Sequence, residues 1–178
     1  PMRLAIGQPA PEFHATTWDG KPVSLADYRG QKLWLAFFRY ASCPLCNVRV
    51  RAIYRRVDEL TKSGVAVVAV FQSPGHKVRE YVLEGDEPPM PIIADPEMTL
   101  YEQYALERSV LGFLQPRNLG GMLDAAKLKV GGMSPDGPMD RIPGDFLIGP
   151  DGTLVDVFYG SAISDHIPFE RVDAFAAR

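Results

Sequence analysis

The sequence predicts an α/β protein in which strands and helices alternate along the chain. Two nearly continuous apolar runs, residues 32–38 and 65–71, are typical of strands that are covered on both faces. Between them, residues 44–62 carry apolar side chains at intervals of three and four and end at Gly64, which indicates a helix. This strand–helix–strand order is the βαβ pattern, and we expect the first run to be a central strand.

A hairpin is expected ahead of this unit. Residues 13–18 and 21–23 have strand-like composition, and Asp19-Gly20 between them readily takes the positive φ angles that tight hairpin turns need. A short helical turn follows at 25–28. The remaining elements that the pattern predicts are a helix at 77–83, a strand at 91–94, a helix at 98–104, a second hairpin at 145–149 and 153–159 with its turn at 150–152, and a last helix at 168–177.

Residues 110–143 break this alternation. They are rich in glycine, at positions 112, 120, 121, 131, 132 and 137, and only 122–128 has helical composition. Simple connections of this length are uncommon in compact domains. We therefore expect an insertion or lid with one short helix, inside a single domain that spans residues 1–178.

Composition narrows the classes of function. A chain of 178 residues with 46% hydrophobic and 23% charged residues is ordinary for one soluble globular domain. Its net charge of -3 gives no electrostatic basis for binding nucleic acid or an anionic membrane. The sequence has neither a basic leader followed by an apolar stretch nor a run of about 18 apolar residues, so we expect a cytoplasmic protein.

The only two cysteines, Cys43 and Cys46, form a C-x-x-C pair at the junction between a predicted strand and a predicted helix. In a βαβ context this spacing indicates a redox-active dithiol. Pro44 favours the first turn of a helix, so Cys43 should lie at the N-cap, where unpaired N–H groups and the helix dipole lower a thiol pKa. Cys46 shares an apolar stripe with Val50 and should face inward. We expect Cys43 to be the nucleophile and Cys46 the resolving thiol, close enough to form a disulfide.

The two cysteines have two other interpretations. The first is an inert structural pair, since cysteines are common in cores, but the start of a helix is a poor place for inert thiols. The second is half of a zinc site, but zinc normally takes four ligands, and His14, His76 and His166 are scattered along the chain. We expect no metal and no organic cofactor.

Two long segments carry a family resemblance. DGKPVSLADYRGQKLWLAFFRYASCPLC and PGDFLIGPDGTLVDVFYG resemble the AhpC/TSA peroxiredoxin-like branch of the thioredoxin superfamily. Within that branch, the C-x-x-C pair is most similar to prostamide synthase-like and selenoprotein L-like members. The resemblance implies a thioredoxin-like fold: a central mixed β-sheet flanked by helices, an N-terminal β-hairpin, and here an insertion before the cis-proline loop.

The resemblance also assigns roles near the second hairpin. Pro143 stands where thioredoxin-like proteins have a cis-proline packed against the dithiol, so we expect a cis Ile142-Pro143 bond. Peroxiredoxins commonly have an arginine in this region that polarises the peroxide. Arg141 is close to that position without occupying it, and we give it a supporting role.

Residues just before the dithiol are further candidates. Arg39 lies four residues before Cys43 and could stabilise its thiolate, although a salt-bridged or solvent-facing arginine at a strand end is an equally good interpretation. Tyr40 and Ser42 complete the candidate substrate-binding or supporting residues.

The chain departs from both parent patterns, counted from Cys43. A typical peroxiredoxin has a threonine three residues earlier and a proline seven residues earlier, where this chain has Tyr40 and Ala36. Thioredoxin has a buried aspartate six residues earlier, where this chain has Phe37. Neither peroxide reduction nor thioredoxin activity can therefore be transferred without further support.

The resulting hypothesis is a thiol-dependent antioxidant enzyme, a peroxiredoxin-like peroxidase or a thiol-disulfide oxidoreductase. Its thiolate attacks a peroxide or a disulfide, the second thiol completes an internal disulfide, and a thioredoxin or glutathione system reduces it. The contrasting hypothesis is a non-catalytic thioredoxin-like binding module or redox sensor. The family resemblance also makes a homodimer the expected oligomeric state.

Overall fold

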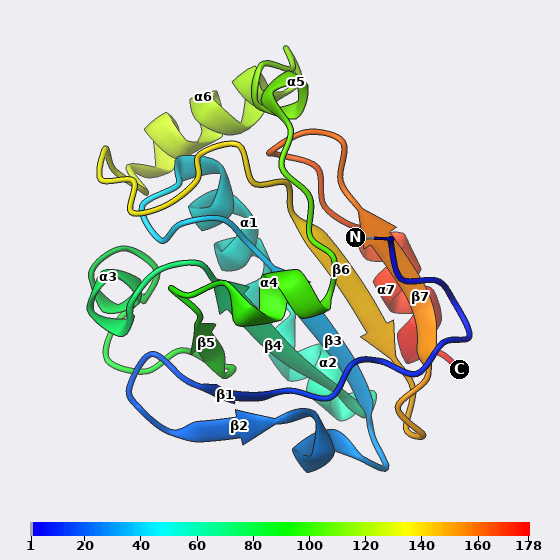
Figure 1. Ribbon diagram of the computed structural model, residues 1–178. Coiled ribbons are helices and arrows are strands. Elements are labelled where there is room, and N and C mark those ends of the chain that lie inside the picture. Colours follow the sequence, from blue (N-terminus) through cyan, green and yellow to red (C-terminus); the bar gives the residue numbers. More distant parts are fainter. Residues whose placement is uncertain (1) are drawn as a thin grey trace.

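A five-stranded mixed sheet forms the centre of the protein in the computed structural model, which describes residues 2–178 (Figure 1). The strand order is β5-β4-β3-β6-β7, with β3, β4 and β5 parallel and with β6 and β7 antiparallel to their neighbours. The strands are β3 (Lys32–Phe37), β4 (Val65–Phe71), β5 (Ile92–Ala94), β6 (Gly144–Ile148) and β7 (Leu154–Tyr159), and a separate hairpin is formed by β1 (His14–Thr16) and β2 (Pro22–Ser24). The predicted mixed sheet, with β3 at its centre, is confirmed.

Helices cover both faces of this sheet. They are the 3-10 turn η1 (Leu25–Tyr28) and the helices α1 (Pro44–Tyr54), α2 (Val57–Lys62), α3 (Gly75–Tyr81), α4 (Thr99–Gln103), α5 (Val110–Phe113), α6 (Asn118–Leu128) and α7 (Phe169–Ala176). Across residues 2–178, no helix has the length and apolar character needed to cross a bilayer.

The alternation of side chains along β3 divides the core into two layers. Trp34 and Phe38 point to the face covered by α1, α2 and α7, while Leu35 and Phe37 point to the face covered by α4 and the β1–β2 hairpin. Successive strand residues face opposite sides of a sheet, so an apolar run without alternation is buried on both. The strand therefore ends inside the protein, and the loop that follows it begins at the edge of a rigid core.

The expected helix at 44–62 is two helices, which corrects that prediction. The chain leaves α1 at Arg55 and enters α2 after Arg56, whose N–H donates to the Ile53 carbonyl in a tighter turn. The Arg56 guanidinium lies 4.0 Å from the Phe169 ring centroid and pairs with Asp173 on α7. Apolar spacing continues through the break because both helices pack on the same sheet face, so periodicity alone did not reveal it.

The segment 110–143 contains two helices, α5 and α6, where one short helix was expected. In Figure 1, α6 crosses over the start of α1 at one end of the molecule. The close crossing depends on Gly121, because a Cβ there would come within 2.1 Å of a Leu45 side-chain carbon. Residues 129–139, which we call the strap, then run back across the loop that precedes α1.

Candidate active site

Cys43 occupies the N-cap of α1, as predicted. Its Sγ accepts a hydrogen bond from the backbone N–H of Cys46 at 3.3 Å, and Pro44 is the first residue of the helix. Both cysteines are free thiols, and both side chains are completely buried. The inward orientation expected of Cys46 is therefore shared by Cys43.

Arg39 lies beside the first thiol. Its Nη1 donates to the Cys43 Sγ at 3.0 Å, and its Nη2 donates to the Met139 carbonyl of the strap. The side chain is 1% exposed, and within residues 2–178 it has no carboxylate partner. Of the two interpretations left open for Arg39, the structure favours a guanidinium directed at the thiol over a solvent-facing or salt-bridged one.

The two thiols differ in acidity. Burial opposes ionisation of Cys43, but hydrogen bonds from Cys46 and the positive charge of Arg39 outweigh it and lower the Cys43 pKa to about 7. Burial raises the pKa of Cys46 well above its ordinary value, and the neighbouring Cys43 raises it further. At neutral pH this arrangement favours one thiolate, on Cys43, next to one neutral thiol.

Two polar side chains that were not predicted from the sequence fix the loop before α1. Asn47 donates from Nδ2 to the carbonyls of Ala41 and Cys43, at 2.7 and 2.9 Å. Ser73, which follows β4, accepts from the Ala41 N–H at 2.8 Å. In the sequence, only the position of Asn47 directly after Cys46 and that of Ser73 after a buried strand could have indicated these roles. The hydrogen bonds themselves depend on how distant segments pack.

The strap covers this loop through several hydrogen bonds. The N–H of Gly132 donates to the Ser42 carbonyl at 2.8 Å, and the N–H of Ser134 donates to the Ser42 hydroxyl at 3.3 Å. The Ser73 hydroxyl donates to Asp136 at 2.7 Å, so one residue joins the strap to the active-site loop. Ser42 and Ser73 therefore bind the strap as well as shape the loop.

An apolar cavity of about 310 Å³ lies between the loop, the strap and the helices α5 and α6. Arg39 and Tyr40 form its polar wall, and the Arg39 guanidinium lies 4.9 Å from the Tyr40 ring centroid. The other lining residues are mostly apolar: Pro44, Leu45, Phe113, Asn118, Met122, Gly132, Met133, Pro135, Met139 and Ile163. Of the predicted residues, Arg39 and Tyr40 line this cavity, and Arg39 joins it to Cys43, which the buried loop holds behind it.

Pro143 lies at the same sheet edge, because it directly precedes β6 and Gly144 pairs with Phe37 at the end of β3. The predicted cis bond is wrong: residues 2–178 contain no cis peptide, so Ile142-Pro143 is trans. The trans form is the lower-energy state of an X-Pro bond, and here the Pro143 carbonyl accepts from the Gly160 N–H at 3.0 Å.

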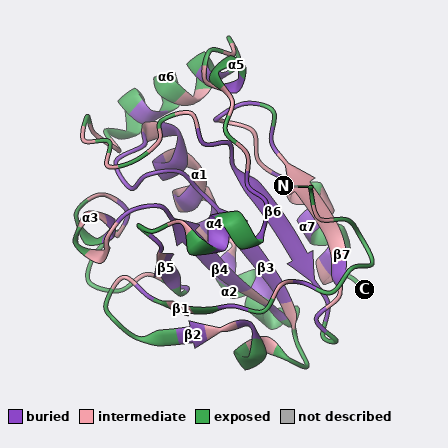
Figure 2. Cartoon of the chain, in the orientation of Figure 1, coloured by how far each residue is buried: buried purple, intermediate pink, exposed green. Residues whose placement is uncertain are grey.

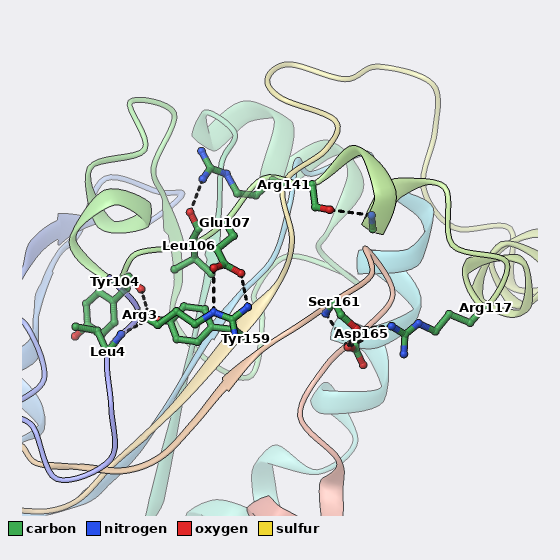
Figure 3. A network of polar contacts seen from close by, with 12 residues as sticks. Arg3, Leu4, Tyr104, Leu106, Glu107, Arg117, Arg141, Tyr159, Ser161 and Asp165 are labelled. Carbon is green, nitrogen blue, oxygen red and sulfur yellow. Dashed lines mark hydrogen bonds and ion pairs between the residues drawn. The ribbon is translucent and has the colours of Figure 1, made fainter. Parts of the chain in front are cut away.

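Arg141 belongs to a different part of the molecule (Figure 3). Its Nη1 donates to the Leu106 carbonyl at 3.0 Å, and it lines a second cavity together with Arg3 and Glu107. It does not line the cavity next to Arg39. The guanidinium beside the thiol is therefore supplied by Arg39, from the end of β3.

The mixed sheet, the helix-capping thiol with lowered pKa and the adjacent neutral thiol define a thioredoxin-like oxidoreductase. A family model described as the AhpC/TSA family matches residues 6–157, so the chain belongs to this family. The predicted class of enzyme and the predicted fold are both confirmed.

Individual relatives agree with this assignment. The chain is similar to peroxiredoxin Bcp of Escherichia coli, with 29% identity over 111 residues, 61% of this chain and 70% of that protein. It is also similar to a Bcp peroxiredoxin of Haemophilus influenzae, with 27% identity over 165 residues, 92% of this chain and 91% of that one. The crystal structure of peroxidoxin BcpB from Mycobacterium tuberculosis has the same fold, with a TM-score of 0.67, 17% identity, and coverage of 97% of this chain and 94% of that chain.

One finer prediction is not supported. The C-x-x-C pair suggested a prostamide synthase-like or selenoprotein L-like branch, whereas the relatives found are Bcp-type peroxiredoxins. A two-residue spacing between cysteines is a short signal that recurs across the thioredoxin superfamily, so it could not distinguish branches.

Proposed function

We propose that the protein is a thiol peroxidase in which Cys43 is the attacking thiolate and Cys46 the resolving thiol. The observation that carries this proposal is the pairing of Cys43 with Arg39, a buried guanidinium with no carboxylate partner within residues 2–178. A buried charge needs a partner of opposite sign, and the Cys43 thiolate is the group in hydrogen-bonding contact with it. The Bcp relatives, named as peroxiredoxins, favour a peroxide as the substrate.

The reaction would proceed in three steps. The Cys43 thiolate attacks the OH-bearing oxygen of the peroxide, and the O–O bond breaks. A Cys43 sulfenic acid forms, which keeps the peroxide's hydrogen, and the leaving oxygen takes a proton from solvent to become an alcohol or water. The Cys46 thiol then attacks the sulfenic sulfur, water leaves, and a Cys43–Cys46 disulfide remains. An external reductant, either a dithiol of the thioredoxin type or two glutathione molecules, would return both cysteines to thiols and leave as a disulfide itself.

Arg39 would bind and polarise the peroxide, a role for which this chain lacks the threonine typical of peroxiredoxins. It can stabilise the thiolate and then donate to the peroxide oxygens, whose negative charge grows as the bond breaks. Tyr40 occupies the position where a threonine was expected, and it lines the same cavity. Ser42 would act indirectly, by holding the strap.

The strap and the helices α5 and α6 would act as a lid. Both thiols are fully buried, so substrate and reductant reach them only when part of this cover moves. The strap is held mainly by hydrogen bonds across the loop, and contacts of this kind can open locally at much smaller cost than the core.

Thiol-disulfide exchange is the second candidate, and the position of the pair favours it. A cysteine at the N-cap with another three residues later in the same first turn is the arrangement of disulfide oxidoreductases. The same thiolate would then attack a disulfide sulfur instead of a peroxide oxygen.

The deciding experiment is stopped-flow oxidation of the reduced protein by hydrogen peroxide and by an organic hydroperoxide, read by tryptophan fluorescence. Oxidation much faster than that of a free thiol, lost in Cys43→Ser and trapped as sulfenic acid in Cys46→Ser, would support the peroxidase. If Cys46→Ser abolishes fast oxidation while Cys43→Ser retains it, the roles of the two cysteines are reversed. Oxidation at the rate of a free thiol would reject the peroxidase, and turnover with a disulfide substrate would then identify the second candidate.

A further inference from the structure

The cavity next to Arg141 is separate from the one beside Arg39. It has a volume of about 760 Å³, within the range typical of small-molecule sites, and it lies between α4, the chain that follows α4, and the end of β7. Figure 2 shows α4 exposed over much of its surface, and Glu102 on this helix is an exposed lining residue, so the cavity opens to solvent. The two cavities share no lining residue. A molecule bound in the second cavity would therefore be distinct from the substrate of the thiols.

Arg141 is the buried charge of this cavity, with only 9% of its surface exposed. Its Nη1 donates to the Leu106 carbonyl at 3.0 Å, and its Nη2 donates to the Met98 Sδ at 3.1 Å, although a thioether is a weak acceptor. Its Nε is enclosed and has no hydrogen-bond partner. Within residues 2–178, no carboxylate lies at ion-pair distance from this guanidinium.

The other two arginines that line the cavity are paired. Arg3 makes a two-point contact with Glu107, at 2.9 and 2.6 Å, and Arg108 donates to Asp140 at 2.8 Å. In Figure 3, Glu107 is bonded to Arg3, whereas Arg141 is bonded to the carbonyl of the preceding residue. The acidic side chains next to the cavity are therefore largely committed to arginines other than Arg141.

The charge of Arg141 is poorly compensated inside the protein. Burial lowers its pKa, and the nearby Tyr101, Asp140 and Glu102 act in the opposite direction without reversing this effect. Buried charges in proteins are normally paired, because an isolated one has lost the solvation that it has in water. One more negative charge at this guanidinium would remove the imbalance.

The backbone around the cavity is strained at two positions. Met98, whose sulfur contacts Arg141, has a φ of 60°, and Ala105, which lines the cavity, has a φ of 56°. Both angles lie in the left-handed region that favours glycine, and these residues flank α4 on its two sides. Strain of this kind is often found at binding sites, where it fixes the position of contact groups.

We propose that this cavity binds a small organic acid through one carboxylate, which pairs with the Arg141 guanidinium. A planar carboxylate matches the planar donor fork of an arginine. The carboxylates of Glu102 and Glu107 line the same cavity and would repel a doubly charged phosphate more strongly than a singly charged acid.

The rest of the cavity suits a carbon chain attached to that carboxylate. Ala105, Leu106 and Ile142 give it an apolar wall, and Gly160 leaves one side free of side-chain atoms. The competing interpretation is a structural arginine that only ties the chain before β6 to the two ends of α4. The two interpretations differ in whether an added acid binds.

The test is titration of the reduced, ¹⁵N-labelled full chain with hexanoate, followed by NMR of the backbone amides. Hexanamide, which has nearly the same shape without the charge, is the matched control ligand. Hexanoate should shift the amides of residues 102–109 and 141–142 until they saturate. Hexanamide should bind at least about tenfold more weakly, because it cannot form the charged hydrogen bonds.

Three variants locate the interaction. Arg141→Met should raise the dissociation constant of hexanoate by about tenfold or more, whereas Arg79→Met, at an exposed arginine on α3, should leave it unchanged. Glu102→Gln removes a repelling charge and should lower the dissociation constant by about two- to fivefold. Circular dichroism checks the fold of each variant, and the exposed position of Glu102 keeps the test valid if Arg141→Met does not fold.

Four results would overturn the proposal. The first is a wild type that shows no saturable binding of hexanoate, which would leave Arg141 as a structural arginine. The second is equal binding of hexanoate and hexanamide, and the third is binding that Arg141→Met or Glu102→Gln leaves unchanged, including binding whose shifts lie around Arg39 instead. The fourth is tighter binding of hexyl phosphate than of hexanoate, which would identify a phosphate site.

Discussion

Among the charged side chains, Arg39 is the one that lowers the pKa of Cys43. It approaches Sγ to 3.0 Å from a fully buried position, where its charge is poorly screened by solvent. Replacing it with methionine should raise the Cys43 pKa from about 7 by at least about 1, because an opposite charge at this distance typically shifts a pKa by about 1–3. The pH dependence of alkylation of Cys43 by iodoacetamide measures this in the protein that keeps Cys46, with the alkylated cysteine identified by mass spectrometry.

The direction of the pH effect follows from the thiolate. Below the pKa the thiol is protonated and slow to react, so the alkylation rate climbs as the pH passes through about 7 in the parent protein and at higher pH in Arg39→Met. Arg79→Met is the control, because Arg79 is exposed on α3 and packs over Trp18. Identical midpoints for Arg39→Met and the parent would show that Arg39 does not stabilise the thiolate.

The strap is the element that decides access to the thiols. Gly131 adopts a φ of 79°, and a Cβ there would lie 2.6 Å from the Pro44 Cα. Gly131→Ala should therefore push the strap away from the loop, whereas most of the core stays intact. If the closed strap is weakened by about 1.4 kcal/mol, the open fraction rises about tenfold, and Cys43 alkylation at fixed pH should accelerate by the same factor.

Gly64→Ala provides a matched control for this substitution. Gly64 has a φ of 80° but nothing within 4 Å of its Cβ position, at the far end of α2. Both variants should lose about 1–2 kcal/mol of stability from placing a Cβ in the left-handed region. Only Gly131→Ala should change the alkylation rate; equal rates in the two variants would mean that the strap does not limit access.

Elements defined by local pattern were predictable, and those defined by distant contacts were not. The strands β3 and β4 and the helix start at Pro44 follow from apolar runs and a helix-capping sequence, which are properties of neighbouring residues. At the break between α1 and α2, Arg56 contacts Phe169 and Asp173, which are distant in the sequence. In α6, Gly121 packs against Leu45 of α1, although glycine is a poor helix former, so propensity underestimated this helix.

The same distinction separates the site residues. Arg39, Cys43 and Cys46 lie close together in the sequence and were identified from it. Ser73 was missed because its bonds join segments more than thirty residues apart, to Ala41 on one side and Asp136 on the other. Arg141 was placed by its distance from Pro143 along the chain, and the fold instead turns it toward Leu106.

At the scale of the whole molecule, buried ionisable groups couple stability to pH. His166 is half-buried and packs against Phe38, and its Nε2 is enclosed without a hydrogen-bond partner in the described structure. Desolvation of the ring, followed by the charge of Arg49, lowers its pKa well below the ordinary range. The folded protein therefore keeps this imidazole neutral. The unfolded chain takes up a proton near pH 6.5, so the unfolded state binds one more proton below that value.

His166→Gln should remove this dependence. As the pH falls from about 7 to about 5, the unfolding free energy of the wild type should fall more steeply than that of the variant. Below the unfolded pKa of histidine, the difference in slope approaches about 1.4 kcal/mol per pH unit. Urea unfolding of both proteins at several pH values measures the difference.

Asp145 has a raised pKa because of burial and acts in the opposite direction, but it is present in both proteins and cancels. His76→Gln, an exposed histidine on α3, should follow the wild type, and parallel curves for wild type and His166→Gln would refute the assignment.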